Sequence, residues 1–477
     1  MKVLVTGAAG FIGHALSRSL LARGDVVIGI DNVNDYYQTS LKDARLADLR
    51  SAGGNRFGFH KQDFSDWAGL NKAFDGVEFD RIVHLGAQAG VRYSIENPHA
   101  YVQSNLSGHV NLLELARHRA VEHMVYASSS SVYGGNTKLP FAVEDRADHP
   151  VSLYAATKKA DELMSETYAH LYRIPLTGLR FFTVYGPWGR PDMAIWKFTA
   201  NILAGKPIPV FNHGDMYRDF TFIDDIIAGV IACLDSAPAD DGSEKAGGSV
   251  KPHALYNIGN HKSEPLMKVI GLLEEACGRK AELDLLPMQP GDVHKTYADI
   301  EAIRRDLGYE PTTSIEVGVP KFVEWFREYH AEPKPAVLKI VDGPWSKMDQ
   351  QPRQPVPALS KGMIPDVPGV YALYRSGQRV YVGKASSLRK RIWNNHCGKG
   401  MVMTGSALRR NIAEHLGIAS ASQIKTRAHM PSEDEVTKVR DWLEGCAFAW
   451  IECETEAEAL GLEVRLKTED KPALTKI

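Results

Sequence analysis

Short apolar runs alternate with longer amphipathic stretches along residues 1–330. The clearest runs are residues 3–5, 26–30, 81–85 and 124–127. Parallel strands that are buried on both faces read as continuous apolar runs, and consecutive parallel strands need a crossover that is usually a helix. The alternation therefore predicts repeated β-α-β units: an α/β fold with a doubly wound parallel sheet covered by helices on both faces.

The pattern changes after residue 330. Residues 331–366 are rich in proline, including Pro352, Pro355 and Pro357, and show little periodicity. This composition is typical of a partly extended linker, and a loop folded against one neighbouring domain is the alternative. Beyond it, two strand-like runs precede a helical, basic stretch, which predicts a second, small α+β domain over residues 367–477.

Composition supports at least two domains and a soluble protein. At 477 residues the chain exceeds what one hydrophobic core usually serves, and 24% of the residues are charged against 44% hydrophobic ones. No apolar run approaches the roughly 18 residues that would span a membrane, so we expect no membrane partner. The N-terminus is unlike a signal peptide, and the five cysteines are scattered without metal-ligand spacing. Both features favour a reducing cytoplasm and no structural metal.

Charge divides unevenly along the chain. Residues 361–477 carry 18 Lys and Arg against 14 Asp and Glu, whereas residues 1–360 carry 38 against 44. The positive excess is a weak indication of an acidic partner for the C-terminal part, since an excess of this size is common in proteins without such a partner.

A glycine-rich turn follows the first predicted strand. Gly7, Gly10 and Gly13 precede an amphipathic stretch, and Asp31 ends the second predicted strand. Glycine permits the tight turn and a close approach of the backbone to a pyrophosphate, while the helix N-terminus supplies N–H groups to the phosphates. Asp31 would accept hydrogen bonds from the adenosine ribose and repel a 2′-phosphate. The pattern predicts a dinucleotide site that prefers NAD to NADP.

Tyr154 and Lys158 are four residues apart, so on a helix they share one face. A phenol is a poor base at neutral pH, but a nearby ammonium and a positively charged nicotinamide favour the phenolate. Tyr154 could then take a proton from a sugar hydroxyl while hydride leaves the same carbon for NAD. The pair alone is common, but the serine run 128–131 at the end of a predicted strand makes it informative.

These motifs resemble the extended short-chain dehydrogenase/reductase family. The resemblance implies an NAD-binding Rossmann domain over residues 1–180, in which Asp63 binds the adenine edge and residues 84–89 lie beneath the cofactor. Ser129 occupies the position of the side chain that hydrogen-bonds the reacting oxygen. The implied cofactor-binding residues are Gly7, Gly10, Phe11, Ile12, Gly13, Asp31, Asn32, Asp63, Ala87 and Lys158.

The two positions after Ser129 bear on the reaction type. Relatives that eliminate water carry Asp-Glu there, and relatives that decarboxylate carry Glu at the second position. This chain has Ser130 and Ser131. Without an extra acid or base, the resemblance implies that a 4-keto intermediate rotates and is reduced on its other face. That outcome is epimerization, with NAD regenerated in each turnover.

Residues 180–194, with 36–37 and 87–94, resemble UDP-glucuronate 4-epimerases, and this resemblance covers essentially all of residues 1–330. It implies a nucleotide-sugar-binding region over residues 181–330, from which the chain returns to the Rossmann domain. It also implies a homodimer through the helix of Tyr154 and the helix near residues 105–117.

The same resemblance assigns the sugar site. Thr183, usually Asn in hexose-specific relatives, and Arg190 would hold a C6 carboxylate. Holding it matters because a 4-keto hexuronate is a β-keto acid, which loses CO₂ when the carboxylate aligns with the ketone. Arg190 could instead be a structural ion pair. Arg218 and Asp292 match positions for the diphosphate and ribose, and Ser131 is assigned to the substrate.

Two other functions remain open for residues 1–330. One is a neutral UDP-glucose/galactose 4-epimerase. The other is a DNA-processing protein whose N-terminal part senses NAD or a nucleotide sugar. The set of Ser129, Tyr154 and Lys158 favours an enzyme, because a sensor needs no base.

The C-terminal part resembles the GIY-YIG nuclease domain. Residues 369–371 and 381–383 repeat an apolar, tyrosine-containing motif around a predicted turn at Ser376-Gly377. The resemblance implies that Glu463 binds one divalent cation, for which Mg²⁺ is expected, while Arg391 stabilises a pentavalent phosphate and Tyr371 or Tyr381 orients or deprotonates the attacking water.

Two departures bear on nuclease activity. Thr475 stands where the family usually has Asn, and about 70 residues separate Arg391 from Glu463, which is longer than in compact members. A domain that keeps the fold and binds DNA without cutting it is the alternative.

Overall fold

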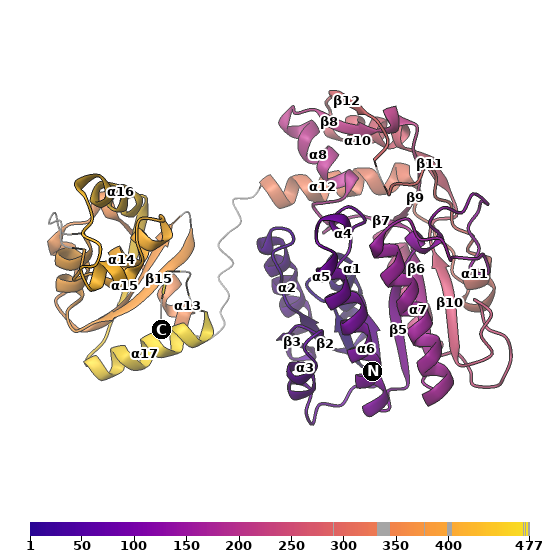
Figure 1. Ribbon diagram of the computed structural model, residues 1–477, viewed down its shortest axis with the longest axis horizontal. Coiled ribbons are helices and arrows are strands. Elements are labelled where there is room, and N and C mark those ends of the chain that lie inside the picture. Colours follow the sequence, from indigo (N-terminus) through magenta and orange to yellow (C-terminus); the bar gives the residue numbers. More distant parts are fainter. Residues whose placement is uncertain are drawn as a thin grey trace. The chain divides into compact units, whose positions relative to one another are not determined.

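The chain folds into two units, Met1–Pro333 and Lys334–Ile477 (Figure 1). The structure is a computed structural model that describes residues 1–289, 291–331, 344–375, 377–397, 403–470, 472 and 474–475. No helix within these residues is long and apolar enough to cross a membrane.

A seven-stranded sheet forms the centre of the first unit, with strand order β10-β6-β5-β4-β1-β2-β3. Its strands are β1 (Lys2–Thr6), β2 (Val26–Asp31), β3 (Phe57–Lys61), β4 (Arg81–His84), β5 (His123–Ser129), β6 (Leu176–Phe181) and β10 (His253–Ile258). Every neighbouring pair is parallel. The predicted doubly wound parallel sheet is confirmed. The strand order reverses at β1, where open sheets of this type bind ligands beyond their carboxyl ends.

Helices cover both faces of this sheet, because successive strand residues point to opposite sides. Val3 and Val5 belong to one apolar core and Leu4 to the other. The first core is covered by α1 (Phe11–Arg23), α2 (Thr39–Gly53) and α9 (Ile223–Asp235), and the second by α3 (Trp67–Ala73), α6 (Gly108–His118) and α7 (Leu153–Tyr172).

Two small sheets and three longer helices of this unit gather beyond the carboxyl ends of the strands (Figure 1). Two small sheets lie there, β11 (Ser263–Pro265) with β9 (Tyr217–Phe222) and β7 (Thr183–Tyr185), and β12 (Leu283–Leu286) with β8 (Ile208–Phe211). The helices are α8 (Ala194–Ala204), α10 (Leu266–Cys277) and α12 (Ile315–Ala331), with the shorter α4 (Tyr93–Glu96), α5 (Pro98–Tyr101), π-helix Val102–Ser107 and α11 (Glu301–Leu307) elsewhere in the unit.

The second unit is built on a four-stranded antiparallel sheet with strand order β13-β16-β14-β15. Its strands are β13 (Gln354–Pro355), β14 (Gly369–Arg375), β15 (Gln378–Ala385) and β16 (Cys446–Glu452). One face packs against α13 (Pro344–Asp349) and α17 (Glu456–Glu469), and the other against the π-helix Lys390–Cys397, α14 (Ala407–His415), α15 (Ala421–Lys425) and α16 (Glu433–Glu444). Of the predicted turn, Gly377 has the positive φ of +81° that favours glycine, and Ser376 lies outside the described residues.

The predicted linker must be shortened. Residues 332–343 lie outside the described residues, but residues 344–366 belong to the second unit. Trp345 is buried there, and its indole N–H donates to the carbonyls of Leu466 (2.6 Å) and Asp470 (3.0 Å). The proline content is typical of a linker, but apolar side chains of this stretch pack into the cores of the second unit.

Candidate active site

A cavity of about 810 Å³ opens at the carboxyl ends of the strands in the first unit. The site residues predicted from the sequence that line it are Gly7, Gly10, Phe11, Ile12, Gly13, Asp31, Asn32, Ala87, Ser129, Ser131, Tyr154, Lys158, Thr183, Arg190, Arg218 and Asp292. Asp63 is not among the lining residues. It accepts a hydrogen bond from the Asn32 amide at 3.0 Å, and Asn32 itself lines the cavity.

The glycine-rich turn leaves no room for side chains. A Cβ on Gly13 would lie 2.1 Å from the Gly7 carbonyl oxygen, and a Cβ on Gly7, whose φ is +68°, would lie 2.9 Å from the backbone of Gly86. Gly10 precedes the first turn of α1, which has no side-chain cap. Unpaired N–H groups at a helix N-terminus beside a cavity suit phosphate oxygens, so these residues fit the pyrophosphate of a dinucleotide.

Asp31 is fixed at the end of β2 by two backbone donors. The N–H of Val33 donates to its carboxylate at 2.8 Å and that of Ala9 at 3.2 Å. Burial raises the pKa of Asp31, against the lowering effect of nearby Lys42. The carboxylate therefore ties the glycine-rich turn to β2 and borders the cavity where an adenosine ribose would fit.

Helix α7 carries the predicted base and its lysine. The Ser152 hydroxyl accepts a hydrogen bond from the Ala155 N–H and caps the helix, which places Tyr154 in the first turn. The Lys158 ammonium donates to the Ala127 carbonyl and to the Asp161 carboxylate, each at 2.9 Å. Burial raises the pKa of Asp161 to about 6, although Lys158 lowers it. Two of the three N–H groups of Lys158 are thus engaged below the cavity.

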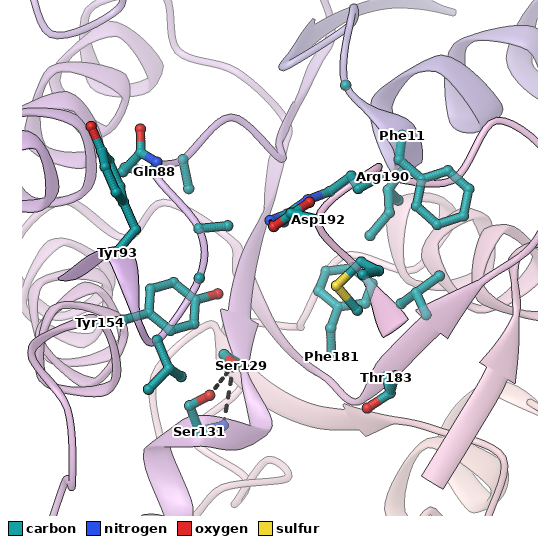
Figure 2. A pocket seen from close by; sticks show the side chains of 18 of the residues that line it. Phe11, Gln88, Tyr93, Ser129, Ser131, Tyr154, Phe181, Thr183, Arg190 and Asp192 are labelled. Atoms are coloured by element: carbon teal, nitrogen blue, oxygen red, sulfur yellow. Dashed lines mark hydrogen bonds and ion pairs between the residues drawn. The ribbon is translucent and has the colours of Figure 1, made fainter. Parts of the chain in front are cut away.

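The serine run at the end of β5 is internally hydrogen-bonded. The Ser129 hydroxyl donates to the Ser131 hydroxyl and accepts from the Ser131 N–H, both at 3.1 Å. Figure 2 shows Tyr154 on the same side of the cavity as Ser129, with its hydroxyl directed into the cavity. The structure therefore brings a phenol and an alcohol together where one sugar hydroxyl could reach both.

Arg190 and Thr183 lie across the cavity from Tyr154 (Figure 2). Arg190 forms a bidentate pair with Asp192, with Nε donating to Oδ1 at 3.0 Å and Nη2 donating to Oδ2. The Tyr36 hydroxyl donates to the same carboxylate at 3.4 Å. The ion pair weighed against a substrate role is thus present, but both members remain about a quarter exposed and line the cavity.

The predicted nucleotide end contains a second aspartate between arginines. Asp292 lies 3.5 Å from Nη2 of Arg92 and 3.5 Å from Nη2 of Arg218. Arg92 also stacks over the Phe211 ring at 4.6 Å. This cluster holds more positive than negative charge beside the cavity, as a diphosphate site requires.

Sequence reasoning missed Asp192 and also Arg45, a fully buried arginine of α2. Arg45 donates to the carbonyls of Ala9 (3.0 Å), Trp188 (2.6 Å) and Gly189 (3.0 Å). It thereby joins the glycine-rich turn to the loop that carries Arg190. Arg45 belongs to no local motif, and Asp192 lies within the block 180–194, where spacing alone does not show which way its side chain turns.

The four residues predicted in the second unit come from β14, the edge strand β15, the π-helix Lys390–Cys397 and α17. Tyr371 in β14 and Tyr381 in β15 have ring centroids 6.1 Å apart. A Cβ on Gly383 would lie 2.8 Å from the Tyr371 hydroxyl, so glycine makes room for the phenol. Burial raises the pKa of both tyrosines, the charge of Arg391 lowers it and the charge of Glu463 raises it further.

Glu463 is held at this edge by α17. Its carboxylate accepts the Lys384 N–H at 3.2 Å and pairs with the Lys467 ammonium at 3.2 Å. Among the described residues, no group of three or more His, Cys, Asp or Glu side chains could hold a metal ion. A single carboxylate still fits Mg²⁺, which usually keeps several waters and uses one or two carboxylates together with substrate phosphates.

His396 is a residue of this second site that sequence reasoning missed. Its Nε2 lies 2.7 Å from the Tyr371 hydroxyl and its Nδ1 lies 2.8 Å from the Ser406 hydroxyl. Burial, with help from Arg391, lowers the pKa of His396 to about 3, so the ring is neutral. Ser406 caps α14, one of the helices that occupy the long stretch between Arg391 and Glu463.

Comparisons with known proteins agree with this division. The family model described as GDP-mannose 4,6 dehydratase matches residues 4–322, and the one described as GIY-YIG catalytic domain matches residues 369–475. The chain is 49% identical to Protein CapI of Staphylococcus aureus, over 69% of this chain and 99% of that protein. It is 50% identical to UDP-glucuronate 4-epimerase 4 of Arabidopsis thaliana, over 71% of this chain and 78% of that protein.

Solved structures give the same result. The UDP-glucuronic acid 4-epimerase of Bacillus cereus, in complex with UDP-glucuronic acid and NAD, is 32% identical with a TM-score of 0.61 and covers 69% of this chain and 100% of its own. The UDP-glucose 4-epimerase of Thermotoga maritima, with UDP-glucose, is 28% identical with a TM-score of 0.61, over 69% and 99%. These matches support an epimerase role for the first unit. The chain belongs to the extended short-chain dehydrogenase/reductase family of GDP-mannose 4,6 dehydratase, and it carries a GIY-YIG domain behind that first unit.

Proposed function

We propose that the first unit converts UDP-glucuronate to UDP-galacturonate by inverting C4, with bound NAD accepting hydride from the sugar and returning it. One observation carries the proposal: a single cavity holds the Tyr154, Lys158 and Ser129 set and, across from it, the guanidinium of Arg190. A neutral hexose would need no cation at that place. The likeness to relatives whose names state UDP-glucuronate 4-epimerase adds support.

The protein's own groups handle the proton and the substrate's orientation. Tyr154 takes the proton from O4 during oxidation and gives it back after reduction on the other face. Lys158, fixed by Ala127 and Asp161, favours the phenolate through its positive charge, and Ser129 hydrogen-bonds O4. Arg190 and Thr183 hold the C6 carboxylate, while Arg218 and Asp292 hold the nucleotide.

Proton NMR on the purified protein with UDP-glucuronate and NAD tests this function. We expect UDP-galacturonate without net NADH, and an Arg190→Ala variant that loses most of this turnover. Arg218→Ala is the matched control, because it removes a cation from the nucleotide end and weakens UDP binding itself. Parent-like turnover of UDP-glucuronate by Arg190→Ala would overturn the carboxylate assignment and leave a neutral hexose as substrate. Absence of any reaction would favour a sensor of NAD or nucleotide sugar.

For the second unit we propose binding and Mg²⁺-dependent cleavage of DNA. The observation that favours it is the convergence of Tyr371, Tyr381, Arg391 and Glu463 within the region that matches the GIY-YIG catalytic domain. Glu463 would hold the ion together with substrate phosphate, and Arg391 would face the phosphate. Incubation with plasmid and Mg²⁺ should nick the DNA, and Glu463→Gln should stop nicking. Equal nicking by parent and variant, or DNA binding without nicking by the parent, would contradict cleavage at this site.

We further propose that the protein is a cytoplasmic homodimer. Leu163 and Leu171 of α7 are 60% and 59% exposed, which leaves an apolar face for a second copy. The five cysteines are all free thiols, as a reducing compartment favours. Light scattering of the parent and of Leu163→Glu tests the dimer: a dimeric parent and a monomeric variant are expected.

A further inference from the structure

We propose that Asp192 is a positioning residue that fixes the plane of the Arg190 guanidinium and thereby suppresses decarboxylation of the 4-keto intermediate. This inference rests on the proposed function of the first unit. Under this inference Asp192 controls which product forms, because Arg190 supplies the positive charge and Asp192 fixes its direction.

The geometry of the pair carries the argument. A guanidinium is a planar fork with two edges that can each receive a carboxylate. Asp192 takes the edge formed by Nε and Nη2, and no hydrogen bond among the described residues takes the edge formed by Nη1 and Nη2. Because both side chains line the cavity, the open edge is available to a substrate carboxylate.

Asp192 is itself held in place by Tyr36. The Tyr36 hydroxyl donates to its Oδ2 at 3.4 Å, and the Tyr36 ring packs against Tyr93 with centroids 4.9 Å apart. Burial and the Asp192 charge raise the pKa of Tyr36 to about 12, so the hydroxyl stays protonated and can only donate to the carboxylate. The guanidinium plane is thus set by a chain of two side chains.

The Arg190–Asp192 ion pair is not needed to hold the loop that carries it. Arg45 already binds the carbonyls of Trp188 and Gly189, which immediately precede Arg190. An ion pair that is about a quarter exposed adds little to folding stability. The orientation of Arg190 toward the cavity is what the pair does determine.

The orientation matters for the chemistry of the intermediate. When C4 is a ketone, the C5–C6 bond can break if it aligns with the carbonyl π orbital, and CO₂ leaves while the electron pair moves into a C4–C5 enolate. A proton then adds at C5, and the hydride removed in the oxidation returns to C4, which gives a UDP-pentose. When an Arg190 of fixed orientation anchors the carboxylate, C6 cannot swing relative to the ring, which keeps the C5–C6 bond out of this alignment.

The test compares products as well as rates. Parent, Asp192→Asn and Asp192→Glu are incubated with UDP-glucuronate and NAD, and UDP-galacturonate and UDP-pentose are quantified by NMR. For Asp192→Asn we expect kcat/KM to fall about tenfold and the pentose fraction to rise several-fold. Asp192→Glu keeps the charge but moves it by one methylene, so its pentose fraction should lie between the other two. It carries the test alone if Asp192→Asn does not fold.

Asp292→Asn is the matched control, since it loosens the nucleotide end. It should raise KM for UDP-glucuronate without raising the pentose fraction. A parent-like pentose fraction in Asp192→Asn would overturn the inference, as would tighter binding of UDP-glucuronate with unchanged products, because Asp192 would then merely compete with the substrate. Arg190→Ala separates the two failures: if it too behaves like the parent, the proposed carboxylate site is wrong, whereas an impaired Arg190→Ala beside a parent-like Asp192→Asn rejects only the role of Asp192.

Discussion

The two units arrange similar side chains in opposite ways. In the first unit a phenol, an ammonium and a guanidinium border a cavity of about 810 Å³. In the second, the two phenols are packed into the protein, with Tyr371 2% and Tyr381 8% exposed, whereas Arg391 and Glu463 are partly exposed. A small substrate has to be enclosed before an unstable intermediate can be protected from water. A polymer needs only its phosphate to reach a surface, so a packed tyrosine pair with a charged rim suffices.

The largest effect is expected when the first unit loses its general base, Tyr154, because the second unit should then stay unchanged. Tyr154→Phe keeps the aromatic packing against Tyr101 but removes the hydroxyl that takes the O4 proton. We expect kcat for UDP-glucuronate to fall about a thousandfold, within the usual contribution of general base catalysis. NMR product formation measures it. The unfolding transition of the second unit serves as the internal reference for the same preparation. A variant that keeps more than a tenth of the parent's kcat would remove Tyr154 from the mechanism.

The boundary between the units can be tested through stability. Trp345 is 1% exposed. Its indole N–H donates to the carbonyls of Leu466 in α17 and of Asp470, which follows that helix, and the Arg379 guanidinium lies 4.5 Å from its ring centroid. Trp345→Ala leaves a cavity and should destabilise the second unit by about 4 kcal/mol. Calorimetry of the full chain should show only one transition moving. Equal shifts of all transitions, or none, would mean that residues 344–349 do not belong to the second fold.

The sequence was most informative where chemistry is local in the chain. The apolar runs, the glycine spacing and the four-residue interval from Tyr154 to Lys158 are each contained in a short segment. The runs form buried strands of the sheet, and the three glycines, Tyr154 and Lys158 line one cavity. Asp192 stands only two residues from Arg190, but its role depends on which way both side chains turn, and spacing does not show that.

The residues that escaped prediction depend on distant partners. Arg45 binds carbonyls more than 140 residues away, and Trp345 binds a carbonyl 121 residues away. The His396 ring lies 2.7 Å from the hydroxyl of Tyr371, which is 25 residues away along the chain. A buried polar group must find a partner wherever the fold supplies one, and no periodicity records that choice.

Acid should act on both units through buried neutral histidines. His396 has a pKa lowered to about 3 by burial, so between about pH 6.5 and 3 the unfolded state binds a proton that the folded state does not. The free energy of unfolding of the second unit should therefore fall as pH drops, by about 2 kcal/mol between pH 7 and 5.

In the first unit, both buried histidines and buried aspartates contribute to the pH dependence of stability. Burial lowers the pKa of His109 to about 3 and of His123 to about 4, while it raises that of Asp161 and Asp219 to about 6, which offsets part of the loss. Calorimetry at pH 7 and 5 should move both transitions down, and His396→Gln should abolish most of the shift in the second unit. An unchanged shift in that variant would assign acid sensitivity to other groups.

The smallest expected effect concerns the departure at Thr475. Strand β15 is at the edge of its sheet, and its outward N–H groups need partners. The N–H of Val382 donates to the Thr475 hydroxyl at 2.9 Å, and the next outward N–H, that of Lys384, donates to Glu463 at 3.2 Å. Thr475 and Glu463 therefore each accept one outward N–H of strand β15.

Thr475→Val keeps the shape of the side chain but removes the acceptor, which leaves the N–H of Val382 buried without a partner. We expect the second unit to lose about 1 kcal/mol and the first unit to stay unchanged, as measured by denaturant unfolding of the full chain. Thr475→Ser keeps the hydroxyl and is the control. Tyr381 precedes Val382 in the strand, so a Thr475→Val variant that cleaved DNA less while losing no stability would show that this edge positions the tyrosine rather than stabilising the sheet. Equal stability and equal cleavage would mean that water replaces the hydroxyl and that the edge is open at this point.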